Sequence, residues 1–162
     1  MRKFLLPCLA AGAALIGSAA YAATTTSTFT VQATIQAQCV INSASTLDFG
    51  TQGVLASNVD QTSTIAVQCT NTTPYNIGLN AGTGSGATVA TRKLTSGGAT
   101  INYSLYTDSG RSTVWGNTVG TDTQAATGSG AAQSYTVYGR IPTQSTPAPG
   151  TYTDTITVTV TY

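Results

Sequence analysis

The sequence predicts an all-β fold, and three observations support this prediction. Thr occurs 33 times and Gly 17 times among 162 residues, a composition that favours strands and turns over helices. Apolar residues alternate with polar ones along several segments, which is the pattern of half-buried strands. Beyond the first 22 residues, no segment shows a convincing helical period. We therefore expect short strands joined by turns.

The first 22 residues have the pattern of a secretory signal peptide. A basic pair at residues 2–3 precedes an apolar run over residues 4–16, and residues 20–22 (Ala-Tyr-Ala) fit a cleavage site. A transmembrane anchor is the alternative, but the run is shorter than the ~17 to 25 apolar residues that span a bilayer. We predict cleavage after Ala22, export to the periplasm, and a mature chain without a transmembrane segment.

Removal of the signal peptide leaves two cysteines, Cys39 and Cys69. In an exported chain they allow one pairing, and an oxidising compartment favours a disulfide. A metal pair or a reactive thiol are the alternatives, but the sequence has no His and the mature chain has no third cysteine to complete a metal site. We therefore predict a disulfide, no metal and no other cofactor.

An alternating strand is predicted near each end of the mature chain. The apolar face of the first consists of Phe29, Val31, Ala33, Ile35 and Ala37. At the other end, apolar residues alternate with Thr over residues 152–162, and Asp154 interrupts the apolar face. Both segments therefore have the pattern of strands with one buried face.

The interior of the chain predicts further short strands between turn-rich stretches. The predicted strands lie near residues 46–50, 63–69, 75–80, 99–107 and 133–141. The turn-rich stretches lie at residues 81–86, 96–98, 108–110, 116–130 and 142–150. Such spacing predicts a sandwich or barrel, and a single cysteine link between strands favours an immunoglobulin-like sandwich.

Charge and chemistry exclude several classes of function. Charged residues make up 7% of the chain, with six basic and five acidic, so no basic footprint for nucleic acid is present. The absence of His removes imidazole general bases and His-containing triads. The Gly-rich run at residues 82–86 lacks the lysine and the helix of a phosphate-binding loop. We predict a protein that is not an enzyme and has no catalytic residues.

Aromatic residues suggest an alternative binding function. Trp115 and nearby tyrosines could form a platform on which sugars stack, although aromatic residues on strands more often pack in the core or in cross-strand pairs. The tyrosines are Tyr103, Tyr106, Tyr135 and Tyr138. A secreted carbohydrate-binding β-sandwich therefore stays open as an alternative.

Several motifs follow one another along the mature chain. The N-terminal alternating strand ends at Cys39, and Leu47-Asp48-Phe49-Gly50 and Cys69 follow. The next motifs are Tyr103-Ser104-Leu105-Tyr106 with Asp108, Trp115-Gly116, and Tyr138-Gly139-Arg140. The most specific is Pro149-Gly150-Thr151-Tyr152-Thr153-Asp154, which leads into the final strand. Taken in order, these motifs resemble the spore coat protein U domain family, which includes subunits of archaic, Csu-type chaperone-usher pili, and the resemblance spans the whole mature chain.

The resemblance implies an incomplete immunoglobulin-like β-sandwich that lacks its last strand. A donor strand from a neighbouring subunit or, before assembly, from a periplasmic chaperone completes such a domain. The expected organisation is a signal peptide over residues 1–22, a donor segment over residues 23–38 and the incomplete domain over residues 39–162. The expected donor residues are Phe29, Val31, Ala33 and Ile35. One alternative is that residues 28–37 form an ordinary first strand of their own domain.

The resemblance also implies a function. We expect a structural pilus subunit that polymerises by donor-strand exchange with copies of itself or with related subunits. A periplasmic chaperone and an outer-membrane usher would assist its assembly into a fimbrium at the cell surface, where it would serve attachment and biofilm formation. The alternatives are a secreted coat or matrix protein and the carbohydrate-binding sandwich.

Overall fold

The computed structural model describes residues 21–162, so the predicted signal peptide lies outside the described residues except for its last two positions. The chain divides into two units between Thr34 and Ile35. Residues 21–34 of the first unit form no helix or strand, and their side chains are exposed. Over the described part of the chain, no helix is long and apolar enough to cross a membrane.

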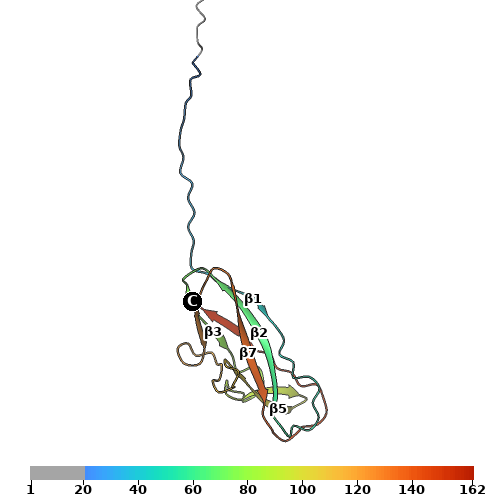
Figure 1. The fold of residues 1–162 in the computed structure, drawn as a ribbon. Helices are drawn as coiled ribbons and strands as arrows, with labels where there is room; N and C mark the ends of the chain where they lie inside the picture. Colours follow the sequence, from blue (N-terminus) through green and yellow to red (C-terminus); the bar gives the residue numbers. More distant parts are fainter. Residues whose placement is uncertain (1–20) are drawn as a thin grey trace, which may run out of the picture. The chain divides into compact units, whose positions relative to one another are not determined.

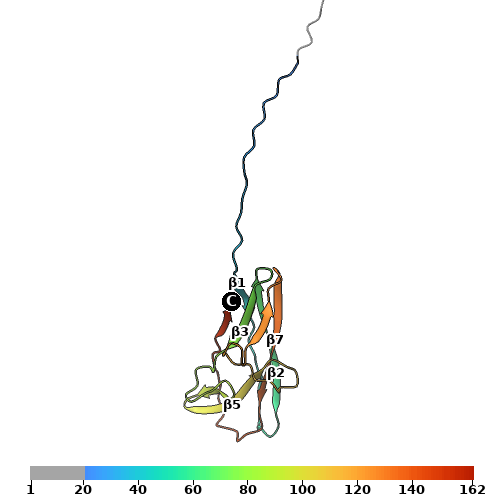
Figure 2. The same cartoon turned by 90° about the vertical axis from the view of Figure 1, so that its left-hand side faces the viewer.

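The second unit is a sandwich of two antiparallel sheets (Figure 1). One sheet has the strand order β1-β2-β7-β5-β4, and the other has the order β6-β3-β8. The strands are β1 (Cys39–Ala44), β2 (Val59–Cys69), β3 (Pro74–Leu79), β4 (Arg92–Ser96), β5 (Ala99–Tyr106), β6 (Gln124–Thr127), β7 (Ala132–Ile141) and β8 (Val158–Thr161). Figure 2 shows β3 and β7 in different layers of the sandwich. The all-β prediction is confirmed.

Alternating side chains build the core between the two sheets. On β2, Ile65 and Val67 are buried, while Thr64 and Gln68 on the opposite face are exposed. On β3 of the facing sheet, Tyr75, Ile77 and Leu79 are buried. Because successive side chains of a strand point to opposite faces, each strand contributes one apolar row to the space between the sheets. Burial of each such side chain stabilises the fold by ~1.5 to 3 kcal/mol.

Trp115 lies in this core rather than on the surface. Its side chain is 1% exposed, and its Nε1 donates a hydrogen bond of 2.8 Å to the carbonyl oxygen of Ile77. Tyr103 is also buried. Trp115 and Tyr103 therefore cannot belong to a sugar-stacking platform, because the core covers the faces that a sugar would need. The other tyrosines considered for it, Tyr106, Tyr135 and Tyr138, are half-buried.

The strand predicted over residues 46–50 is also wrong. Pairing between β1 and β2 ends at Ala44, and the backbone N–H of Gly50 then donates to Asp48 Oδ1 at 2.8 Å. Gly50 has a φ of 71°, which suits a glycine in a tight turn. Leu47 meanwhile packs on Gly139 of β7, where an added Cβ would lie 2.7 Å from Leu47 Cδ1. The turn thus directs this segment into the sandwich instead of along the sheet.

Three strands, β1, β4 and β6, lacked an alternating signal in the sequence and were not predicted. β4 begins at Arg92, which is 0% exposed and donates from Nη2 to the carbonyl oxygens of Leu79 (3.0 Å) and Trp115 (2.7 Å). Burial lowers the pKa of this guanidinium. β6 has four residues and lies within the stretch 116–130 that we expected to be turns. A hydropathy pattern cannot predict that Arg92 is buried, because its burial depends on hydrogen bonds to backbone carbonyl groups.

The two strands predicted at the chain ends also differ from the structure. The final strand was expected over residues 152–162, but β8 covers Val158–Thr161. Before it, Thr153 forms an isolated bridge with Thr95 of β4, so the segment passes from one sheet to the other. Residues 28–37 belong to no strand. Alternation indicates which side chains can be buried, but a strand also requires a neighbouring strand with which its backbone can form hydrogen bonds.

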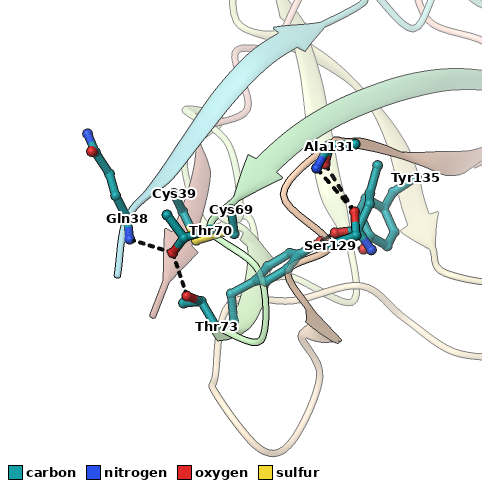
Figure 3. The surroundings of a disulfide bond; sticks show 10 residues. Gln38, Cys39, Cys69, Thr70, Thr73, Ser129, Ala131 and Tyr135 are labelled. Carbon is teal, nitrogen blue, oxygen red and sulfur yellow. Dashed lines mark hydrogen bonds between the residues drawn. A yellow bond between two sulfur atoms is a disulfide. The ribbon is translucent and has the colours of Figure 1, made fainter. Parts of the chain in front are cut away.

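Cys39 and Cys69 form the predicted disulfide. They face each other as the first residue pair of the β1–β2 ladder, with their Cα atoms 4.1 Å apart. The bond therefore joins neighbouring strands of one sheet, unlike the disulfide of antibody domains, which links the two sheets. Figure 3 shows Gln38 extending the ladder, with its N–H donating to Thr70 Oγ1 at 3.1 Å. The Thr70 N–H returns a bond of 2.9 Å to the Gln38 carbonyl oxygen.

Removal of the disulfide should destabilise the protein. In the chain-entropy model, opening a loop of this length restores unfolded-state freedom equivalent to ~3.6 kcal/mol, so we expect the double substitution Cys39→Ser/Cys69→Ser to lower the free energy of unfolding by up to about that amount. Urea unfolding measures this change. Mass spectrometry of periplasmic material should find no alkylatable thiol at either position, and two free thiols would contradict the assignment.

Candidate functional site

The two sheets have four outer strands, β1, β4, β6 and β8, and within residues 21–162 none of their outer edges is paired with a further strand. Two of these edges, those of β1 and β8, lie next to each other. β1 is an outer strand of the five-stranded sheet, and β8 is an outer strand of the three-stranded sheet. The two strands contact each other, and Figure 2 shows β1 next to the C-terminal end of the chain. Each edge presents unpaired backbone N–H and C=O groups, to which another strand can add.

Side chains along these edges face the core but remain partly exposed. Ile41 of β1 lies opposite the buried Val67, yet Ile41 itself is 42% exposed. Val160 of β8 lies opposite the buried Ile77 and is only half-buried. Tyr162 continues the same alternation and is 59% exposed. Core-facing side chains that stay exposed on both edges indicate that the sandwich is open along this side.

A cavity of about 310 Å³ lies where β1 ends and β8 begins, and Ala44 and Val158 are the residues of these two strands that line it. Core residues from both sheets form its floor, including Ile65, Leu79 and Val137. Residues 44–49 form one wall, and residues 154–158 form the other. The cavity therefore reaches from solvent to the centre of the sandwich.

A second cavity of about 740 Å³ continues the first. Both cavities are lined by Leu47, Phe49 and Leu94, and the second extends along residues 50–55 and 146–152. We call the two cavities together, with the adjoining edges of β1 and β8, the edge groove. The edge groove has both apolar and polar groups in its lining, and its length suits an extended peptide rather than a compact ligand.

Asp154 fixes one wall of the edge groove. Its Oδ1 accepts hydrogen bonds from the Thr83 N–H (2.7 Å) and the Thr83 hydroxyl (2.9 Å), and its Oδ2 accepts one from the Tyr103 hydroxyl (2.7 Å). Tyr103 lies on β5 of one sheet, and Thr83 follows β3 of the other. Gly82, with a φ of 83°, allows this approach because an added Cβ would overlap Asp154 Oδ2. One carboxylate thus joins the wall to both sheets.

Burial keeps the Tyr103 hydroxyl protonated, so that it can donate its hydrogen bond to Asp154. Burial, followed by the hydrogen bond to Asp154, raises the pKa of Tyr103 well above its usual value. The hydroxyl therefore stays protonated at neutral pH and donates to the carboxylate. The most specific motif of the sequence, which ends at Asp154, positions a wall of the edge groove.

Substitution of Asp154 tests this role. Asp154→Ala leaves the buried Tyr103 hydroxyl without its acceptor, and an unsatisfied buried group costs ~1 to 3 kcal/mol, whereas the exposed Thr83 N–H can bond to water instead. We expect the free energy of unfolding of the mature chain to fall by about 2 to 3 kcal/mol in urea titrations. Tyr103→Phe should cost less, because it removes a donor together with its need for a partner.

Asp48→Ala is the matched control. Asp48 lines the edge groove too, but it is exposed and accepts one backbone bond, from Gly50. We expect that variant to lose less than about 1 kcal/mol, as is usual for surface changes. Equal losses for Asp154→Ala and Asp48→Ala would show that Asp154 does not hold the wall.

The structure leaves the predicted donor residues exposed. Phe29 is 87%, Val31 84% and Ile35 81% exposed, and Ala33 is exposed as well. These residues form no strand in the single chain, whereas an ordinary first strand would bury its apolar row. Their role as donors stays a prediction.

The sequence predicted a groove left open by a missing strand, but not the residues that line it. Its lining comes from separate segments, and alternation marks most of these residues simply as core. Residues 29–35 as the segment that enters the groove stay a prediction.

Comparison with known proteins places this arrangement in a family. Residues 25–159 match the Spore Coat Protein U domain. The chain belongs to this family. Protein U of Myxococcus xanthus is 34% identical to it over 176 aligned residues, which cover 99% of this chain and 98% of that protein. The resemblance read from the sequence motifs is confirmed.

A solved structure supports the same fold. The match is to a chain in the crystal structure of the CsuC–CsuE chaperone–tip adhesion subunit pre-assembly complex, from the archaic chaperone-usher Csu pili of Acinetobacter baumannii. The two chains share 27% sequence identity with a TM-score of 0.58. The match covers 80% of this chain and 40% of that one, so the present chain spans less than half the length of its structural neighbour.

Proposed function

We propose that this protein is a structural pilus subunit that polymerises by donor-strand exchange. In this proposal, residues 29–35 of one copy enter the edge groove of the next copy and pair with β1, β8 or both. One observation carries the proposal: core-facing residues such as Ile41 and Val160 are left partly exposed on two free strand edges. The chain also carries an exposed apolar row of matching period. A strand added at a sheet edge gains affinity from backbone bonds and specificity from alternate side chains.

The chemistry of the two surfaces is complementary. Residues 23–38 contain no charged side chain, so their insertion desolvates no charge. Burial of Phe29, Val31 and Ile35 at ~1.5 to 3 kcal/mol each gives roughly 5 to 9 kcal/mol before entropy costs. That is comparable to the whole net stability of a domain, ~5 to 15 kcal/mol. A subunit with an empty groove should therefore be marginally stable and prone to aggregate through its free edges.

This marginal stability explains the partners that we propose. A periplasmic chaperone would cover the groove before assembly, and an outer-membrane usher would organise export to the cell surface. The likeness to a chain of a chaperone–tip adhesion subunit complex supports the chaperone. The resulting fimbrium would serve surface attachment and biofilm formation, a role that requires no catalysis.

A secreted coat or matrix protein is the second candidate. The likeness to Protein U over nearly the full length of both chains, within a family described by a spore coat protein, favours it. Filaments on cells and co-purification with a periplasmic chaperone support the pilus subunit. A layer that forms without filaments and without a chaperone supports the coat protein.

A fusion protein tests donor-strand insertion directly. Residues 24–36 are attached after Tyr162 through a flexible Gly/Ser linker, and the original N-terminal segment is deleted. The linker gives the strand an effective concentration in about the mM range. The strand makes only contacts that it would also make in the filament. We expect a soluble monomer in gel filtration that needs no chaperone and cannot polymerise.

The matched control is the same deletion without the added strand. The fusion protein should melt many degrees higher than this control, because the strand contributes energy on the scale of total stability, where 1 kcal/mol shifts Tm by about 2 to 8 °C. A control that is already a stable, cooperative monomer would show that the groove needs no donor. That result would refute the proposal.

The alternation of side chains along residues 29–35 provides an independent prediction. Phe29→Asp or Ile35→Asp would bury a charge in the groove, so we expect either to block polymerisation while the chaperone-bound subunit stays folded. Thr30→Asp and Thr34→Asp, on the opposite face, are the controls and should have milder effects. Electron microscopy and sedimentation measure the outcome. Equal damage from both parities would exclude insertion by alternate side chains.

A further inference from the structure

The disulfide lies where tension would enter the domain of a filament subunit. If residues 29–35 are held by one neighbour, pulling force reaches the domain through Gln38 and Cys39. The force leaves through the donor strand of the other neighbour, seated in the edge groove. Since β1 leads from Cys39 to Ala44, where the wall of that groove begins, it lies on the path between the two points. This force path rests on the proposed function.

β1 on its own is a weak element. It has six residues, is bonded on one side by β2, and its register shifts between Ile41 and Ser43. After Cys39, all of its residues are exposed, so few side-chain contacts hold it. Force applied at Cys39 acts at the end of the ladder, where it would break the pairs with β2 one after another instead of all together. Loss of β1 would remove one wall of the groove.

β2 is a strong element by comparison. It has eleven residues and lies between β1 and β7, with a register of ten residue pairs to β7. Cys69, its last residue, is 1% exposed. The surrounding backbone is closely packed, because the Gly130 N–H donates to the Cys69 carbonyl oxygen at 3.0 Å and an added Cβ on Gly128 would lie 2.8 Å from Cys69 Cβ. Cys69 is therefore a firm anchor.

From these observations, we propose that the Cys39–Cys69 disulfide is a mechanical latch that shields the edge groove from tension on the subunit's own N-terminal segment. The bond joins the first residue pair of β1 and β2, so force entering at Cys39 passes directly to Cys69 and into β2. Figure 3 shows that Gln38 and Thr70 continue this connection on the side from which the force arrives. The latch thereby keeps tension on the N-terminal segment from peeling β1 off β2.

Single-molecule force measurement tests the latch. The protein is the full mature chain with a copy of residues 24–36 linked after Tyr162, so that the groove is filled. One handle is attached to the N-terminus and the other to the end of the added strand, which reproduces the two loading points of the filament. The oxidised protein is compared with Cys39→Ser/Cys69→Ser, and with the oxidised protein reduced on the tether in case that variant does not fold.

With the disulfide, we expect no extension before the donor strand is released. Without it, an early extension should appear as β1 peels away. Its length should be ~20 Å for the six residues of β1 and up to ~70 Å if all residues before β2 are freed. At constant force, donor release should then be at least about tenfold faster, which corresponds to a barrier lower by about 1.4 kcal/mol.

A second loading point separates the latch from a general loss of stability. Asn71 is exposed and lies two residues after Cys69, so a handle on its side chain loads β2 without passing through β1. In this geometry, we expect the oxidised and disulfide-free proteins to release the donor strand at the same rate. Equal release rates under N-terminal loading, or a disulfide effect of the same size under Asn71 loading, would overturn the latch. A fusion protein that self-associates in gel filtration would instead refute donor-strand insertion, and the latch with it.

Discussion

Two unpaired strand edges that face each other across an exposed core determine how this molecule is built. A β-sandwich normally covers its core by completing both sheets, but here β1 and β8 leave Ile41 and Val160 partly exposed. Unpaired backbone groups and exposed apolar side chains each have a cost in free energy, and the two occur along the same groove. Any strand that fills the groove resolves both at once. The roles of the disulfide and of Asp154 follow from this arrangement.

Each wall of the groove is held by an interaction outside the strand ladders. Cys39 is covalently joined to Cys69 at the start of β1, and Asp154 connects the segment before β8 to Tyr103 and Thr83. These ties are needed because edge strands have a ladder on one side only. A groove whose walls are fixed in advance loses less conformational freedom when a strand enters, which favours binding.

The sequence was sufficient for the fold class and for part of the site. Alternation located β2, β3, β5 and β7, and two cysteines in a chain predicted to be exported were sufficient for the disulfide. It failed for β4, where Arg92 occupies a core position because backbone carbonyl groups accept its hydrogen bonds. It also failed at residues 46–50, where a turn at Asp48 and Gly50 directs an apolar segment into the sandwich. The missing strand was predicted through the family resemblance, but the residues that line the groove could not be, since its walls come from segments that are far apart in the sequence.

Hydrogen exchange on assembled material is the measurement that tests donor-strand insertion most directly. The backbone amides of residues 28–36 and the edge amides of β8 are compared before and after assembly of the mature chain. Insertion predicts that both groups become protected together, because each supplies partners to the other. Residues 28–36 that exchange freely in the assembled form, or that are already protected in the isolated subunit, would contradict insertion into a neighbouring copy.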